Sequence, residues 1–297
     1  MQMSKTVYLD NSATTPLCDA AKEAMREAME CYGNPSSLHP EGVRAGMLLE
    51  QARRTVAATL GLRGTLSPGQ VIFTASGTEA DLLALRGTAL GKPRRKGGRI
   101  ITTDSEHSAV EKTVAALESE GFEVVRIPTR QGVLDLDAYE KALNDRVFLV
   151  SLMTVNNETG ALYDVGTAFA MAKAKNPDVV THTDAVQGYL KGKLLPKALS
   201  ADLVSVSGHK THAPKGVGAL IVSPDALRRR DLAPVLLGGG QEGGFRSGTE
   251  NLIGIAGFAA AAEEGFAALG ARVERMRELR DYAEEKLLAL MKKENLI

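Results

Sequence analysis

The chain has 297 residues, of which 44% are hydrophobic, so it can bury a large core in one big domain with an appendage or in two modest domains. Lys plus Arg equal Asp plus Glu at 36 each, and no basic block stands out. This balance excludes the basic footprint of a nucleic-acid-binding protein. We therefore expect a small-molecule partner and no nucleic acid.

Targeting signals and cysteines bear on where the protein works. The longest apolar stretch, residues 253–262, is too short to span a bilayer, and residues 1–5 lack the apolar core of a signal peptide. Only two cysteines occur, Cys18 and Cys31, which is too few for a disulfide framework in a chain of this length. We expect a cytoplasmic protein without a membrane segment.

The first elements predicted in chain order are two helices, because apolar residues follow helical spacing over 19–30 and 41–60. A strand over 70–74 then runs into a turn and a third helix. The first N–H groups of such a helix form an anion site, where Gly77 permits close approach and Thr78 adds a hydroxyl. Thr78 and Asp81 also fit a capping box, a structural role that needs no ligand.

The middle of the chain alternates strands with helical segments such as 109–120. This alternation predicts an α/β fold with a mostly parallel sheet that carries helices on both faces. Ligands of such sheets bind beyond the carboxyl ends of the strands, where Thr78, His107, Asn157, Asp184 and Lys210 fall. The predicted strands cover residues 99–103, 122–127, 147–153, 179–183, 203–207 and 218–222.

Two of these strand ends carry residues suited to pyridoxal phosphate chemistry. A carboxylate can hold the pyridine nitrogen of that cofactor protonated, which suits Asp184, although an aspartate that closes a strand is more often a turn or capping residue. Lys210 follows the next strand, where partial burial would lower its pKa and favour a Schiff base. The alternative for Lys210 is an ordinary surface lysine.

Taken together, these segments resemble the cysteine desulfurases of the class V, NifS-like aminotransferases. The resemblance covers nearly the whole chain and implies the type I fold of pyridoxal phosphate-dependent transferases, with a seven-stranded sheet. The matching motifs occur in family order at residues 8–16, 33–39, 76–79, 106–107, 155–160, 179–188, 202–216 and 246–249.

The resemblance implies a role for each matching residue around pyridoxal 5'-phosphate. Lys210 would bind the cofactor aldehyde and then move the α-proton of the substrate, and His107 would stack on the ring and assist proton transfer, unless it only caps its loop. Arg246 is as compatible with a structural role as with ligand binding. Asn157 and Gln187 would bond near the ring hydroxyl; Gly77, Thr78, Ser207 and His209 would hold the phosphate; and Thr249 would reach the phosphate of a partner subunit in a homodimer.

The implied reaction converts L-cysteine, or selenocysteine, into L-alanine and passes the sulfur to an acceptor protein, with no metal. We expect an N-terminal segment over 1–15, a large cofactor-binding domain over 16–264, and a linker helix over 265–297 that leads toward a small domain missing from this chain. No residue matches the family's sulfur-accepting thiol or its carboxylate-binding arginine, and Cys31 is not assigned that role. A truncated or split enzyme that does not complete turnover alone is therefore expected. Another class V lyase or aminotransferase and a non-catalytic cofactor-binding subunit are the alternatives.

Overall fold

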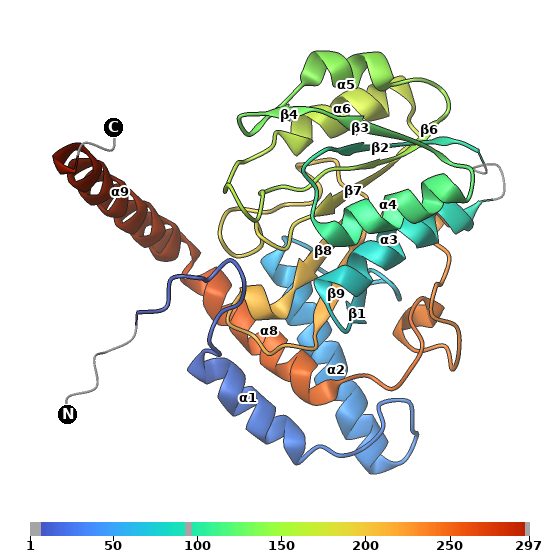
Figure 1. The fold of residues 1–297 in the computed structure, drawn as a ribbon. Coiled ribbons are helices and arrows are strands. Elements are labelled where there is room, and N and C mark those ends of the chain that lie inside the picture. Colours follow the sequence, from blue (N-terminus) through green and yellow to red (C-terminus); the bar gives the residue numbers. More distant parts are fainter. Residues whose placement is uncertain (1–6, 93–96, 295–297) are drawn as a thin grey trace.

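A seven-stranded sheet in the order β1-β9-β8-β7-β6-β2-β3 forms the centre of the computed structural model, which describes residues 7–92 and 97–294 (Figure 1). Among these strands β9 alone is antiparallel to its neighbours, β1 and β8, and the other pairs are parallel. The predicted mostly parallel sheet is confirmed. The strands are β1 (Val71–Thr74), β2 (Arg99–Thr103), β3 (Glu123–Ile127), β6 (Val147–Ser151), β7 (Val180–Asp184), β8 (Leu203–Ser207) and β9 (Gly218–Val222).

Helices cover both faces of this sheet, as predicted. Successive side chains of a strand point to opposite faces, so Val71 and Phe73 of β1 enter one core while Ile72 enters the other. The first core includes α1 (Asp19–Met29), α2 (Pro40–Thr59), α5 (Leu136–Ala142), α6 (Val165–Lys175) and α8 (Leu252–Ala267), and the second includes α3 (Gly77–Gly91), α4 (Ser108–Ser119) and α7 (Pro224–Arg229).

Some short elements were not predicted from the sequence. The hairpin of β4 (Thr129–Arg130) and β5 (Val133–Leu134) has two residues in each strand, too few for an alternating pattern to be detected. The 3₁₀ turns η2 (Gly208–Lys210) and η3 (Glu242–Gly244) likewise have no periodic signal. Of these, η2 matters most for function because it carries Lys210.

The C-terminal helix differs from the expected one at its start. Gly265 lies buried inside α8, and the chain turns at Ala268 before α9 (Leu269–Lys293) begins. The two helices meet at 74°, and α9 projects from the body with no buried residue (Figure 1). Across the described ranges no single helix has the length and apolar character needed to cross a membrane; only this bent pair passes that test jointly.

Candidate cofactor site

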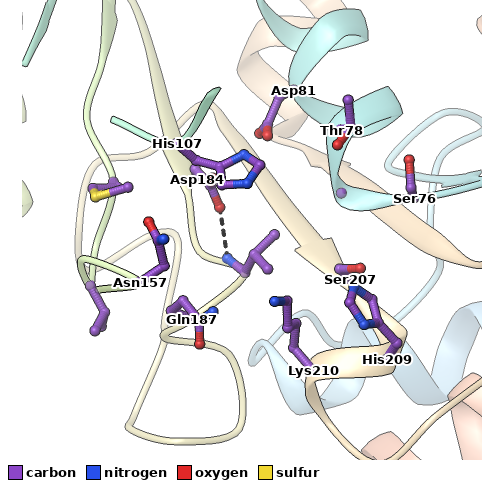
Figure 2. Close-up of a pocket in the computed structure, with 14 residues that line it drawn as sticks. Ser76, Thr78, Asp81, His107, Asn157, Asp184, Gln187, Ser207, His209 and Lys210 are labelled. Atoms are coloured by element: carbon purple, nitrogen blue, oxygen red, sulfur yellow. Dashed lines mark hydrogen bonds between the residues drawn. The ribbon is translucent and has the colours of Figure 1, made fainter. Parts of the chain in front are cut away.

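One cavity lies beyond the carboxyl ends of the parallel strands, where the sequence places its polar residues (Figure 2). Every predicted site residue except Thr249 lines it. The predicted residues in its wall are Gly77, Thr78, His107, Asn157, Asp184, Gln187, Ser207, His209 and Lys210. Five further residues line the cavity although the sequence predicted no role in the site for them: Ser76, Asp81, Met153, Val155 and Val186.

The turn between β1 and α3 forms one end of the cavity. Ser76 is the N-cap of α3, because its hydroxyl accepts a hydrogen bond from the Glu79 N–H at 3.1 Å. Glu79 in turn accepts from the Ala75 N–H at 2.8 Å. The predicted capping box of Thr78 and Asp81 is therefore wrong. Both of these side chains are left to line the cavity.

Gly77 and Ser207 leave room for a ligand at this end. A Cβ on Gly77 would lie 2.8 Å from Val186 Cγ2 and 3.2 Å from Ser207 Cβ, so a side chain would crowd the wall. The Ser207 hydroxyl is buried and has no hydrogen-bond partner among the described residues. A free hydroxyl beside the N-terminus of a 15-residue helix offers donors to an anionic group such as a phosphate.

Asp184 closes β7 and lies near the middle of the cavity (Figure 2). Its side chain accepts a hydrogen bond from the Val186 N–H at 2.9 Å. Burial raises the pKa of Asp184, while the Val186 N–H and the charges of His107 and Lys210 oppose that rise. A buried carboxylate in this position favours a ligand group that brings its own proton or positive charge.

Asp81, from the first turns of α3, places a second carboxyl beside the first. Its side chain is almost completely buried, and its Oδ1 has no hydrogen-bond partner in the part of the chain described. Ligand atoms of Asp81, His107 and Asp184 all lie within 4.8 Å of one another, a spacing that would suit a metal ion as well as a cationic ring nitrogen. Burial and the nearby Asp184 raise the pKa of Asp81 well above its usual value. Of the two carboxyls, Asp81 is therefore the one that more readily keeps a proton.

Neutral groups surround the Asp81 carboxyl on its inner side. His182 lies between Ser151, 2.8 Å from its Nδ1, and Ser205, 3.0 Å from its Nε2. Burial lowers the pKa of His182 to about 3, so its ring is uncharged at neutral pH. Its Nε2 is 3.6 Å from Asp81 Oδ1. Because the ring is uncharged, it does not favour ionisation of the Asp81 carboxyl.

His107 both caps a helix and borders the cavity. Its Nδ1 accepts a hydrogen bond from the Ala109 N–H at 3.1 Å, which makes it the N-cap of α4. The helix cap uses Nδ1 and not Nε2. Figure 2 shows the His107 ring lying over Asp184. The preceding Glu106 holds the loop against β6, because its carboxyl accepts from the Met153 N–H at 3.0 Å and the Thr103 hydroxyl at 2.8 Å.

Lys210 extends from η2 toward the N-terminal segment. Its ammonium donates hydrogen bonds to the carbonyls of Ser12 and, at 2.8 Å, Ala13. Thr15 ties this segment to the same turn, since its hydroxyl and its N–H both donate to the His209 carbonyl at 2.9 Å. Burial lowers the pKa of Lys210, and the carboxylates of Asp10 and Asp184 partly offset this. An amine whose pKa is lowered in this way is more often free to attack a carbonyl carbon.

The loop after β6 supplies Asn157. Its neighbour Asn156 holds the loop: the Asn156 side chain accepts from the N–H groups of Glu158 and Thr159 and donates to the Ser105 carbonyl at 3.0 Å. Asn157 is thereby presented to the cavity, on the side opposite Ser76 and Thr78 (Figure 2).

Other candidate residues lie outside the cavity. Thr249 is exposed, and Arg246 forms an ion pair with Glu79 at 2.7 Å, which gives Arg246 a structural contact. Cys18 caps α1 through its sulfur, and Cys31 is 6% exposed within the core. Neither of these two thiols, both of which are described, lines the cavity.

The residues present fit pyridoxal phosphate. The free Ser207 hydroxyl, the open space at Gly77 and the start of α3 suit its phosphate. The buried Asp184 suits its ring nitrogen, and the Lys210 amine lines the same cavity.

Comparisons with known proteins agree with this fit. The chain is 42% identical over 294 residues to a cysteine desulfurase of Cereibacter sphaeroides, covering 98% of this chain and 72% of that protein. It is 40% identical over 287 residues to the cysteine desulfurase NifS of Azotobacter vinelandii, covering 96% and 69%. Among solved structures, a NifS-like protein matches with a TM-score of 0.89 at 38% identity over 96% of this chain and 76% of that one.

A second solved structure, described as SspA in complex with cysteine, matches with a TM-score of 0.80 at 35% identity, covering 87% of this chain and 72% of that one. The profile of the class-V aminotransferases matches residues 7–296. The chain therefore belongs to the class-V aminotransferase family, within its cysteine desulfurase group of pyridoxal phosphate-dependent enzymes.

Proposed function

We propose that this protein removes sulfur from L-cysteine, leaving L-alanine. In this reaction the carbon–sulfur bond of cysteine breaks, the sulfur forms a new bond to an acceptor thiol as a persulfide, and a proton replaces it on the β-carbon. When bound, pyridoxal phosphate supplies the electron sink for the pair left at the α-carbon. The observation that carries the proposal is the meeting of Lys210, Asp184 and the start of α3 in one cavity.

The chain's own side chains have distinct tasks in this proposal. Lys210 binds the cofactor aldehyde and later carries the α-proton, which its lowered pKa favours. The Asp184 carboxylate would accept a hydrogen bond from the ring nitrogen and would keep that nitrogen protonated. His107 would stack on one face of the ring and assist proton transfer.

The remaining wall residues orient the cofactor. Ser207, His209, Gly77 and Thr78 hold the phosphate, and Asn157 and Gln187 lie at the opposite side, near the ring hydroxyl. We also propose a homodimer in which the exposed Thr249 reaches the phosphate bound by the second copy. The two unpaired cysteines accord with a reducing compartment such as the cytoplasm.

Cofactor capture by Lys210 is tested with two lysine variants. The purified protein should turn yellow with pyridoxal phosphate, and Lys210→Ala should abolish this absorbance. The matched control, Lys215→Ala, changes an exposed lysine in the same turn and should retain it. A yellow Lys210→Ala variant, with the aldehyde trapped on another lysine, would contradict the assignment.

Sulfur removal is tested by measuring L-alanine released from L-cysteine, with dithiothreitol as a small acceptor thiol. Because neither described thiol lines the cavity, the rate of alanine formation should rise with the concentration of dithiothreitol added beyond the thiol of the substrate itself. A protein that binds the cofactor but forms no alanine under any condition would instead favour a non-catalytic cofactor-binding subunit or an enzyme that does not complete turnover alone. Selenocysteine serves as a second substrate in the same assay.

A further inference from the structure

Lys191 lies just outside the cavity and contacts one of its wall residues. Its ammonium donates a hydrogen bond to Gln187 Oε1 at 2.6 Å. On its other side, Gln187 Nε2 donates to the Ser12 carbonyl at 2.9 Å. An ammonium only donates and a carbonyl only accepts, so both contacts require the same orientation of the Gln187 amide. The side-chain nitrogen of Gln187 is thus fixed on the side of Ser12 and Lys210.

The Lys191 ammonium loses hydration in this position, a cost that an ordinary surface lysine does not have. Burial, together with the charge of Lys210, lowers the pKa of Lys191 to about 8. A long lysine side chain ordinarily extends its charged end into water, which avoids this cost. The ammonium instead remains partly buried against Gln187, which is itself 9% exposed. The hydrogen bond to Gln187 therefore offsets part of the hydration that the Lys191 ammonium loses.

We propose that Lys191 is a positioning residue, which turns the Gln187 amide so that an N–H faces the cavity. The amide nitrogen carries two hydrogens, and the Ser12 carbonyl takes only one of them. The second is available to an occupant that presents an acceptor oxygen at this place. This inference rests on the proposed function, in which that oxygen is the ring oxygen of pyridoxal phosphate.

A donor at this oxygen changes the acidity of the bound cofactor. With pyridoxal phosphate bound through Lys210, such a donor would draw charge from the ring oxygen and would lower the pKa of the proton that this oxygen would share with the Lys210 nitrogen. Loss of the donor should therefore raise the pH at which this proton leaves. The absorbance of the bound cofactor reports that pH directly, without any turnover.

The test compares Lys191→Met, Lys191→Arg and the exposed control Lys193→Met. Lys191→Met should raise the midpoint of the absorbance titration by about one pH unit and weaken cofactor binding roughly tenfold, as expected for one charge-assisted hydrogen bond. Lys191→Arg, which keeps the charge and the donors, should restore most of both values. Lys193→Met should match the unmodified protein, and thermal melting shows that each variant is folded.

A double variant gives the sharpest outcome. If Lys191 acts only through Gln187, the effects of Lys191→Met and Gln187→Leu should not add in the combined variant. Full additivity, or an unchanged titration in a folded Lys191→Met protein that binds the cofactor, overturns the inference alone. Failure of the unmodified protein to bind pyridoxal phosphate overturns the proposed function, and the inference with it.

Discussion

Glu106 should make the stability of this protein fall as the pH rises. Its carboxyl is buried beside the His107 loop, and its Oε2 has no hydrogen-bond partner among the described residues. Burial raises the pKa of Glu106 from its ordinary value of 4.5 to about 8, although bonds from Met153 and Thr103 oppose that rise. The folded chain therefore keeps this proton over a pH range in which the unfolded chain has lost it.

The size and sign of the effect follow from this difference. The stabilisation is fully present below pH 4.5 and is lost as the pH rises through about 8. A separation of about 3.5 pH units, at about 1.36 kcal/mol each, gives an upper bound of about 5 kcal/mol in the free energy of unfolding.

Glu106→Gln isolates this contribution, because glutamine resembles the protonated acid and does not titrate. Urea unfolding from pH 5 to pH 9 should show the unmodified protein losing several kcal/mol relative to the variant, about 5 at most. Other buried acids titrate in both proteins and cancel in the difference. The exposed control Glu158→Gln should leave the profile unchanged. A constant difference between the unmodified protein and Glu106→Gln across this range would refute the assignment of a protonated Glu106.

The other predictions concern the cavity and the cysteines. Asp184→Asn should weaken pyridoxal phosphate binding by roughly 1.5–3 kcal/mol in equilibrium dialysis. Asp104→Asn, on an exposed turn, should leave binding unchanged. Equal losses in the two variants would make Asp184 a turn residue only. Gly77→Ala should lower cofactor affinity in dialysis and, through crowding, reduce stability in thermal melting by about 1–3 kcal/mol. In the control Gly270→Ala the added Cβ meets nothing within 4 Å, so affinity and stability should both stay unchanged. Cys31→Ser should leave alanine formation from cysteine unchanged in a folded protein; loss of that activity would make Cys31 the sulfur acceptor.

The residues that sequence reasoning found share one property. Asp184 and Ser207 end buried strands, and Lys210 lies in the turn after the second of these strands. The carboxyl ends of parallel strands meet at one edge of a sheet. Their place in the cavity could therefore be predicted from local pattern and topology. The roles of Asp184 and Lys210 were first indicated by residue type and position, whereas the role of Ser207 came from family resemblance.

The residues that it missed depend on contacts between distant segments. Asp81 fits a helix-capping pattern equally well, and only the observed Ser76 cap frees it for the cavity. Lys191 is an unremarkable lysine in the sequence, since nothing local indicates that its ammonium meets Gln187. The bend at Ala268 was missed for a similar reason, because helical spacing continues on both sides of it.

Burial decides which groups of this site carry charge, and that choice suits the proposed cofactor. His182 is neutral, and the pKa of Asp81 is raised more strongly than that of Asp184, so a proton held between the two carboxyls lies more readily on Asp81. Two adjacent carboxylates would repel each other and would draw in a metal ion or a second proton. A single carboxylate instead matches one ring nitrogen that carries one proton. A proton held on Asp81 thus favours the ionised form of Asp184, against the burial that raises the pKa of Asp184.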